Sequence, residues 1–123
     1  MLSRPEQLRE RTKAFALRII RLFRSLPYKT DTQVLGKQLL RCGTSVAANY
    51  RAVCRARSKA EFVARIGIAA EEADESVLWL ELLTDSGILK AEMTEGLLTE
   101  ARELAAILTA SQQTAKKDSI ARF

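Results

Sequence analysis

The sequence predicts an all-α fold: an antiparallel four-helix bundle in up-down-up-down order, built as a single domain over residues 1–123. Three observations lead to this prediction. Glycine and proline are scarce, at five and two residues, which leaves little material for the tight turns of an all-β protein. Apolar residues recur every three or four positions along four segments, which is the spacing of one helix face. The connections between these segments are short, and short connections make successive helices antiparallel.

The first helix is predicted over about residues 5–26. Pro5 suits the first turn of a helix, and Pro27 cannot continue one. Between the two prolines, the predicted core positions alternate steps of four and three residues, as in a helix that packs in a bundle. These positions are Leu8, Thr12, Phe15, Ile19, Leu22 and Leu26.

The second helix is predicted from Asp31, a residue type that caps helix starts, to about Arg57. Its core positions are Leu35, Leu39, Cys42, Val46, Asn49 and Val53. A second apolar set covers more of the helix than one core needs, and it comprises Val34, Leu40, Ala47, Ala48, Tyr50 and Cys54. Small residues such as Gly36 and Gly43 allow a neighbouring helix to come close. The broad apolar surface of this helix has two interpretations. It packs tightly within the subunit, or one of its faces meets another subunit, which is the interpretation that we favour.

The third helix has the clearest start, because Ser58 and Glu61 have the spacing of a capping box. Gly87 is placed to end it. Its core positions run from Phe62 to Leu83, and Val63, Ala70 and Val77 form a parallel apolar line. Trp79 lies off the core line, and it is interpreted as an interface rim residue, a base-stacking platform or plain packing.

The fourth helix is predicted over about residues 91–117, followed by a frayed tail over residues 118–123. The surplus apolar faces of the second and third helices predict a homo-oligomer. The residues predicted at this interface are Val34, Leu40, Ala47, Tyr50, Val63, Ala70, Val77 and Trp79. Asn49 is predicted to be a hydrogen-bonded polar group that sets helix register or subunit pairing.

Charge divides the chain in two: residues 1–57 carry a net charge of +10 and residues 58–123 a net charge of −5. An arginine-rich half is typical of proteins that bind phosphate backbones. The predicted phosphate contacts are Arg11, Arg18, Arg21, Arg51, Arg55 and Arg57. The alternative is intramolecular, with the basic half neutralising the acidic residues Glu71, Glu72, Asp74 and Glu75 of the third helix.

No residue pattern points to catalysis, a metal or a cofactor, so none is predicted. The chain has no histidine, which bundle di-metal sites use together with glutamate, and the acidic cluster is interpreted as a solvated or salt-bridged face. Cys42 and Cys54 are predicted to lie about 18 Å apart along one helix, too far for a disulfide. Reduced, inert thiols indicate a cytoplasmic protein. No apolar run reaches the length of a membrane span.

Two segments carry a family resemblance: LLRCGTSVAAN at 39–49 and RARSKAEFVARIGIAAEEADESVLWLELL at 55–83. They resemble the four-helix-bundle proteins encoded within intervening sequences of bacterial 23S ribosomal RNA genes. This resemblance implies a bacterial cytoplasmic protein that assembles into a ring, with a pentamer expected. A more distant similarity is to accessory proteins of diversity-generating retroelements. The family often has Ile-x-Glu after the central asparagine, whereas here Asn49 is followed by Tyr50-Arg51-Ala52.

Together these observations predict a non-enzymatic nucleic-acid-binding protein of unknown biological role, with RNA favoured over DNA. The alternative is a structural or adaptor module whose ring recruits a protein partner, such as a reverse transcriptase or a ribosome-associated factor.

Overall fold

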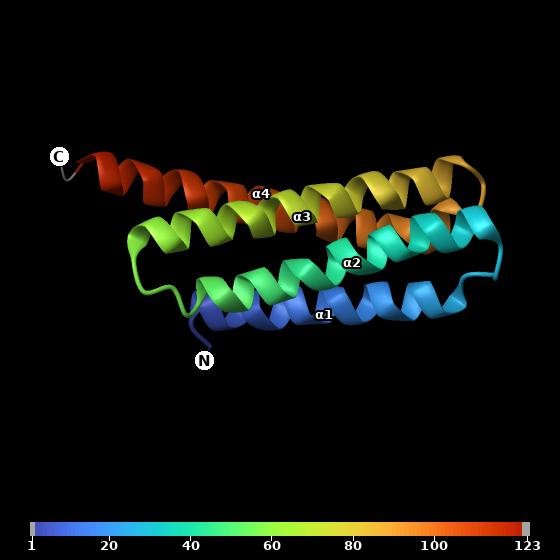
Figure 1. Cartoon of the computed structure of the whole chain (residues 1–123), viewed down its shortest axis with the longest axis horizontal. Helices are drawn as coiled ribbons and strands as arrows, with labels where there is room; N and C mark the ends of the chain where they lie inside the picture. The colour runs from blue at the N-terminus through green and yellow to red at the C-terminus, as the bar shows by residue number, and fades with distance from the viewer. Residues whose placement is uncertain (1, 122–123) are drawn as a thin grey trace.

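The computed structural model describes residues 2–121, and the side chains of residues 2–118. It contains four α-helices: α1 (Arg4–Ser25), α2 (Thr30–Val53), α3 (Lys59–Asp85) and α4 (Ala91–Ala121) (Figure 1). There is no strand within the described residues. The predicted all-α four-helix bundle is therefore confirmed.

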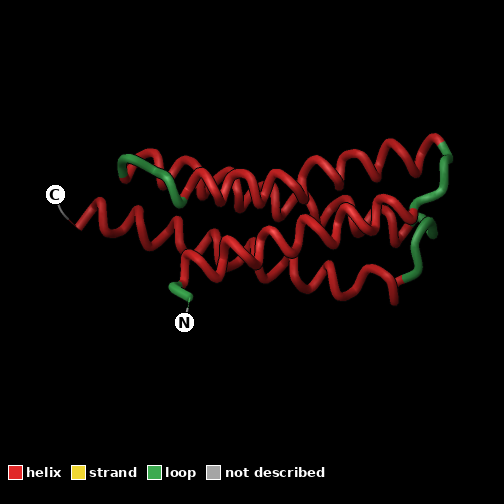
Figure 2. Tube along the Cα trace, turned by 90° about the horizontal axis from the view of Figure 1, so that it is seen from below, coloured by secondary structure: helices red, strands yellow, loops and turns green. Residues whose placement is uncertain are grey.

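The three connections lie at opposite ends of the bundle. The α1–α2 and α3–α4 connections are at one end, and the α2–α3 connection lies at the other end together with both ends of the described chain (Figures 1 and 2). We call this second end the termini end. Helix α2 packs against α1 and α3, and α4 packs against α3, whereas α1 and α4 touch each other only lightly.

Two predicted helix ends are confirmed. The hydroxyl of Ser58 accepts a hydrogen bond from the backbone N–H of Glu61 at 3.1 Å, which satisfies one of the free amides at the start of α3. Gly87 adopts a φ of +83°, a conformation that side chains other than glycine rarely tolerate. In a capping box, the Glu61 side chain would also accept the backbone N–H of Ser58. Here it forms an ion pair with Arg57 at 3.8 Å instead.

The predicted limits of α2 are corrected at both ends. The helix begins at Thr30, one residue before Asp31, and Lys29 stands at the N-cap without a side-chain hydrogen bond. Asp31 still contributes in the first turn, because its carboxylate accepts the N–H of Thr32 at 2.8 Å. The helix ends at Val53 rather than near Arg57, so residues 54–58 form the connection to α3. Cys54 is therefore exposed, whereas Cys42 is buried as expected.

The predicted end of α4 at about residue 117 is corrected, because the helix continues to Ala121, and fraying of this tail stays a prediction. The final turns contain neither glycine nor proline, so nothing in the local sequence stops the helix. Residues 122 and 123 belong to the same prediction and lie outside the described residues.

The two glycines of α2 bring α1 close. A Cβ atom on Gly43 would lie 2.8 Å from Ile19 Cγ1, and one on Gly36 would lie 2.6 Å from Leu26 Cδ1. Such separations are too short for carbon atoms. At Gly43 a side chain would meet the branched Ile19 close to the backbone of α1, whereas at Gly36 it would have to displace the end of the Leu26 side chain. The packing interpretation therefore holds for these two positions, which face the chain's own first helix.

The core runs the length of the bundle. Its fully buried large side chains come from all four helices and include Phe15, Ile19, Leu39, Ile66, Leu80 and Leu104. Each such side chain contributes about 1.5–3 kcal/mol by leaving water. Buried hydroxyls are hydrogen-bonded, as in the 2.8 Å pair between Thr84 and Thr94. None of the described helices combines the length and apolar character needed to cross a membrane.

Candidate nucleic-acid interface

Basic side chains gather at the termini end of the bundle. The start of α1 lies beside the end of α2 here (Figure 1), so basic residues far apart in the sequence become neighbours. Tyr50 of α2 senses two of these charges. Burial raises the pKa of Tyr50 to about 12, and the nearby charges of Arg4 and Arg9 lower it, so both arginines of α1 lie close to the end of α2. We call this group of basic residues the cationic end, and it comprises Arg4, Arg9, Arg51, Arg55, Arg57 and Lys59.

The basic side chains of the cationic end are almost free of carboxylate partners. Within the described side chains, only Arg57 forms an ion pair, with Glu61 at 3.8 Å. That separation is long and Arg57 is 89% exposed, so the pair holds its guanidinium weakly. Three of the predicted phosphate-binding residues, Arg51, Arg55 and Arg57, therefore lie together with their charge available.

A surface cleft of about 630 Å³ opens at the cationic end, between the start of α1, the α2–α3 connection and the last turns of α4. A smaller cleft of about 340 Å³ adjoins it on the side of Tyr50. Both clefts are lined by Arg4, Val53, Phe62 and Ser111. The basic surface therefore contains a cleft, and the aromatic side chain of Phe62 forms part of its wall.

Arg11, also a predicted phosphate contact, is paired with glutamates of α4. Its Nε and Nη2 atoms donate to the two carboxylate oxygens of Glu100 at 2.8 and 2.6 Å, and Nη2 also reaches Glu103 at 3.2 Å. These hydrogen bonds to Glu100 raise the pKa of the Arg11 guanidinium. Two carboxylates therefore offset the charge of Arg11, although its side chain is 35% exposed, and we leave it out of the candidate interface.

Arg18 and Arg21 lie apart from the cationic end. Arg18 runs beside α4, where its Nη2 atom would be 3.1 Å from a Cβ on Gly96, and Arg21 is exposed on α1. Neither forms an ion pair with a described side chain. Of the six predicted arginines, three therefore lie at the termini end and two lie along α1 without an ion pair. The sixth, Arg11, is paired with glutamates of α4.

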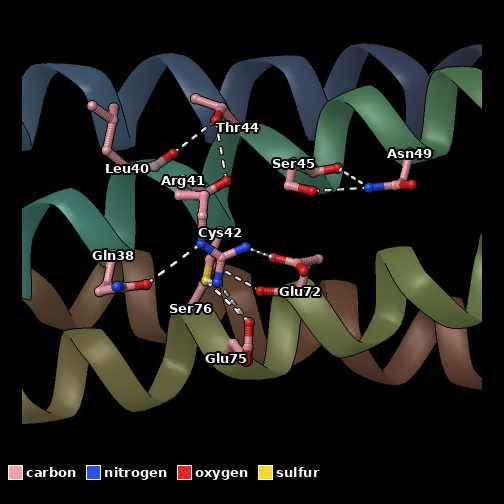
Figure 3. Close-up of polar contacts among 10 residues, drawn as sticks. All are labelled: Gln38, Leu40, Arg41, Cys42, Thr44, Ser45, Asn49, Glu72, Glu75 and Ser76. Atoms are coloured by element: carbon pink, nitrogen blue, oxygen red, sulfur yellow. Dashed lines mark hydrogen bonds and ion pairs between the residues drawn. The ribbon is translucent and has the colours of Figure 1, made fainter.

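The predicted alternative, neutralisation of the acidic third helix, is realised at one point (Figure 3). Arg41 of α2 pairs with Glu72 at 3.3 Å and with Glu75 at 3.2 Å. Its Nη2 atom also lies 3.1 Å from Cys42 Sγ. Intramolecular neutralisation therefore uses Arg11 and Arg41, and at the cationic end it is limited to the long Arg57–Glu61 pair.

The same cluster contains the one candidate metal-ligand group among the described residues: Cys42, Glu72 and Glu75, with ligand atoms within 4.8 Å of one another. The guanidinium of Arg41 already contacts all three side chains. Burial, followed by the hydrogen bond to Glu75, raises the pKa of the Cys42 thiol to about 12. A protonated thiol is a poor metal ligand, so this chemistry favours an ion-pair cluster.

Asn49 forms its hydrogen bonds within α2. Its Nδ2 atom donates to the backbone oxygen and to the hydroxyl of Ser45, both at 2.9 Å (Figure 3). The prediction of a hydrogen-bonded polar group is confirmed. Its suggested part in subunit pairing stays a prediction.

The predicted oligomer interface is only partly on the surface. Tyr50 and Ala70 are 4% and 8% exposed, because the chain's own helices cover them, and the expectation of an outward face is corrected for these two. Val34 is 58% exposed. The remaining predicted interface residues are half-buried, namely Leu40, Ala47, Val63, Val77 and Trp79.

Exposed apolar residues that the sequence reasoning missed lie on the outer face of α3. They are Ile68, Leu78 and Leu82. In the sequence they are apolar residues outside the predicted core positions of the third helix. That pattern alone does not show whether such a residue packs against another helix or faces solvent. Trp79 nearby has a buried Nε1 atom without a hydrogen-bond partner, an arrangement that costs stability.

Arg4, Arg9 and Lys59 were likewise missed as site residues. The usable signal was the antiparallel pairing of the first two helices, which brings residues near 4–9 beside residues near 51–57. Phe62 was assigned to the core, and the structure places it both against the core and in the cleft wall.

Comparisons with known proteins show a family and solved structures that are similar to this chain. Residues 6–110 match the family described as 23S rRNA-intervening sequence protein. A crystal structure at 1.70 Å of a protein of unknown function from the S23 ribosomal protein family, from Bacteroides thetaiotaomicron, is 32% identical. The match covers 90% of this chain and 99% of that one, with a TM-score of 0.83. No curated protein sequence matches the chain.

Proposed function

This chain belongs to the 23S rRNA-intervening sequence protein family, and from that premise we propose that it is a non-enzymatic RNA-binding protein that acts through its cationic end. In this proposal the antiparallel bundle is the scaffold, and phosphates bind Arg51, Arg55 and Arg57. The protein acts in the bacterial cytoplasm as a homo-oligomeric ring, with a pentamer expected.

One observation carries the proposal: six basic side chains converge at the termini end, and only Arg57 among them pairs with a described carboxylate. Like charges held together without counter-charges repel one another, and a polyanion relieves that repulsion. Binding would also release the counterions condensed on the nucleic acid, which favours association at low salt.

RNA is proposed over DNA because arginine dominates the cationic end. The planar guanidinium binds phosphate in a bidentate manner and also stacks on unpaired bases. Loops, bulges and single strands present such bases more often in RNA than in duplex DNA. Arg18 and Arg21 could extend the contact along α1 as secondary phosphate ligands.

The homo-oligomer is proposed from the exposed apolar side chains on α2 and α3. Val34, Leu78 and Leu82 are 58%, 48% and 39% exposed, although each would be more stable out of water. A second copy of the chain that covers these outer faces would bury them. The cationic end lies away from these residues along the bundle, so it would stay accessible in such an assembly.

The test is fluorescence anisotropy with structured RNA, single-stranded RNA and duplex DNA at two salt concentrations. We expect salt-sensitive binding that is tightest for RNA. The R51E/R55E/R57E variant should lose about 100-fold in affinity at low salt, with a flatter salt dependence. The matched control is R24E/K29E/K37E, three exposed basic residues outside the proposed contacts, which changes the net charge equally. Absence of binding at low salt, or equal losses in the two variants, would contradict the proposal.

A second candidate function rests on the same exposed apolar side chains of α2 and α3. These faces could recruit a protein partner, which makes the chain a structural or adaptor module. A pull-down from nuclease-treated lysate separates the two candidates, because a protein partner would survive nuclease and an RNA-bridged one would be lost.

A further inference from the structure

The cleft at the cationic end has walls of two chemical kinds. Its apolar lining includes Val53 of α2, Phe62 of α3 and Ala110 of α4. Its volume of about 630 Å³ lies within the ~300–1,000 Å³ typical of small-molecule sites. The cleft can therefore hold a flat apolar group of the size of a single nucleobase.

Polar groups surround this apolar surface. Arg4 and Lys59 supply positive charge, while Ser111 and Thr114 supply hydroxyls that form no hydrogen bond to another described residue. Ser58 accepts the N–H of Glu61 and still has its own hydroxyl proton to donate. These groups suit a ligand that is apolar in its body and anionic at one side.

Asp118 adds a hydrogen-bond acceptor to the lining. A carboxylate repels a second phosphate but accepts hydrogen bonds from an exocyclic amino group, as carboxylates do with cytosine. A simple anion or a fatty acid would gain nothing from this residue. A base with an amino group would be bound by it.

The surroundings of the cleft point to one nucleotide of a longer strand. Arg55 and Arg57 lie on the connection that forms one wall and are exposed beside the cleft. Their charge continues beyond the cavity on the side of this connection, so a phosphate next to the bound nucleotide would also find a partner. A free mononucleotide would leave these two arginines unused.

We propose that this cleft takes a single unpaired nucleotide, with its base against Phe62 and its phosphate on Arg4 and Lys59. The inference rests on the proposed RNA-binding function and deepens it, because it makes the protein selective for single-stranded segments, loops or bulges over duplexes. Stacking on an aromatic side chain is the means by which proteins hold unpaired bases without needing their sequence.

The test compares two probes of equal length, a fluorescent single-stranded RNA and the corresponding RNA duplex. The wild-type protein should bind the single strand more tightly. The Phe62→Leu variant keeps an apolar side chain in the core but removes the ring, and it should lower single-strand affinity about tenfold while duplex affinity stays unchanged. Its salt dependence should also stay unchanged, because the phosphate contacts remain. Phe23→Leu, at the other end of the bundle, is the matched control.

A second variant protects the test against a folding defect. Thr114→Trp fills the cleft from an exposed position of α4 and should reproduce the selective loss, with the thermal unfolding midpoint close to that of the wild type. If the wild-type protein binds neither probe, the proposed function fails. If it binds both probes and the two variants lose nothing, or lose affinity equally for strand and duplex, RNA binding stands and the nucleotide cleft is overturned.

Discussion

The arginines in the middle of the bundle differ from those at its termini end. Arg11 and Arg41 each contact two glutamates from a neighbouring helix, whereas Arg51 and Arg55 contact no described carboxylate. Midway along a bundle, an arginine faces another helix and whatever acidic residue that helix carries. At the end of a helix it faces a connection and solvent. The positive charge of a segment therefore locates an interface only after the internally paired arginines are removed from the count.

The largest effect on stability is expected at Arg11. Arg11→Ala should lower the free energy of unfolding by about 1–3 kcal/mol, because it leaves the largely buried Glu100 carboxylate, 17% exposed, without its hydrogen-bonded partner. Urea unfolding measures this change. RNA affinity should stay within about threefold of the wild type, since the cationic end is untouched.

Arg18→Ala is the control for Arg11→Ala, because Arg18 lies on the same side of α1 without a carboxylate partner. It should change the unfolding free energy by less than about 0.5 kcal/mol. A second check is the double variant Arg11→Met with Glu100→Leu, which should recover most of the loss. Equal destabilisation by the two alanine variants would show that the ion pair contributes nothing.

A smaller effect is expected from the thiol beside Arg41. Cys42 has a pKa of about 12 in the folded protein against 9.0 for a free thiol, so above pH 9 the unfolded chain binds fewer protons than the folded one. The free energy of unfolding should then fall as pH rises from 9 towards 12, by about 1 kcal/mol per pH unit from this group. Urea unfolding at pH 8, 9 and 10 measures the slope.

Cys42→Ala removes this titration and should flatten the decline between pH 9 and 10. Tyr50 is also buried, with its pKa raised from 10.0 to about 12, and it adds a smaller decline that begins below pH 10. Because Tyr50 is present in both proteins, the difference in slope between the wild type and Cys42→Ala isolates the thiol. Identical slopes in the wild type and Cys42→Ala would contradict the raised pKa.

The smallest effect on stability is expected at the cationic end itself. Arg55→Ala should leave the unfolding free energy within about 0.5 kcal/mol of the wild type, because the side chain is exposed and has no described carboxylate partner. The same change should weaken RNA binding uniformly across sequences. If Arg55→Ala clearly lowered the free energy of unfolding and left RNA affinity unchanged, Arg55 would stabilise the fold as Arg11 does. The contrast between paired and unpaired arginines would then be contradicted.

Most of the fold was predictable because it depends on local patterns. Helix periodicity, the Ser58 cap and the Gly87 stop are each set by residues within a few positions of one another. The misplaced ends of α2 and α4 show the limit of such patterns. Asp31 accepts one free amide, that of Thr32, from inside the first turn, and the residues after 117 carry no helix breaker.

The candidate site was predictable only in part. Arg51, Arg55 and Arg57 stand close in the sequence, and their clustering needs no tertiary information. Lys59 follows Arg57 by two residues, so its place was also readable from the sequence. Arg4 joins them only because α1 and α2 pack side by side, and Phe62 enters the cleft only because the walls around it come from other helices.

The sequence by itself determined the helical class, the helix starts and stops with local signals, the family and the division of charge between the two halves. The tertiary structure decided which arginines keep their charge available. The physical reason is distance: an ion pair forms or fails within about 4 Å. Whether Arg11 lies within that reach of Glu100 depends on how α1 and α4 are aligned, which neither helix specifies alone.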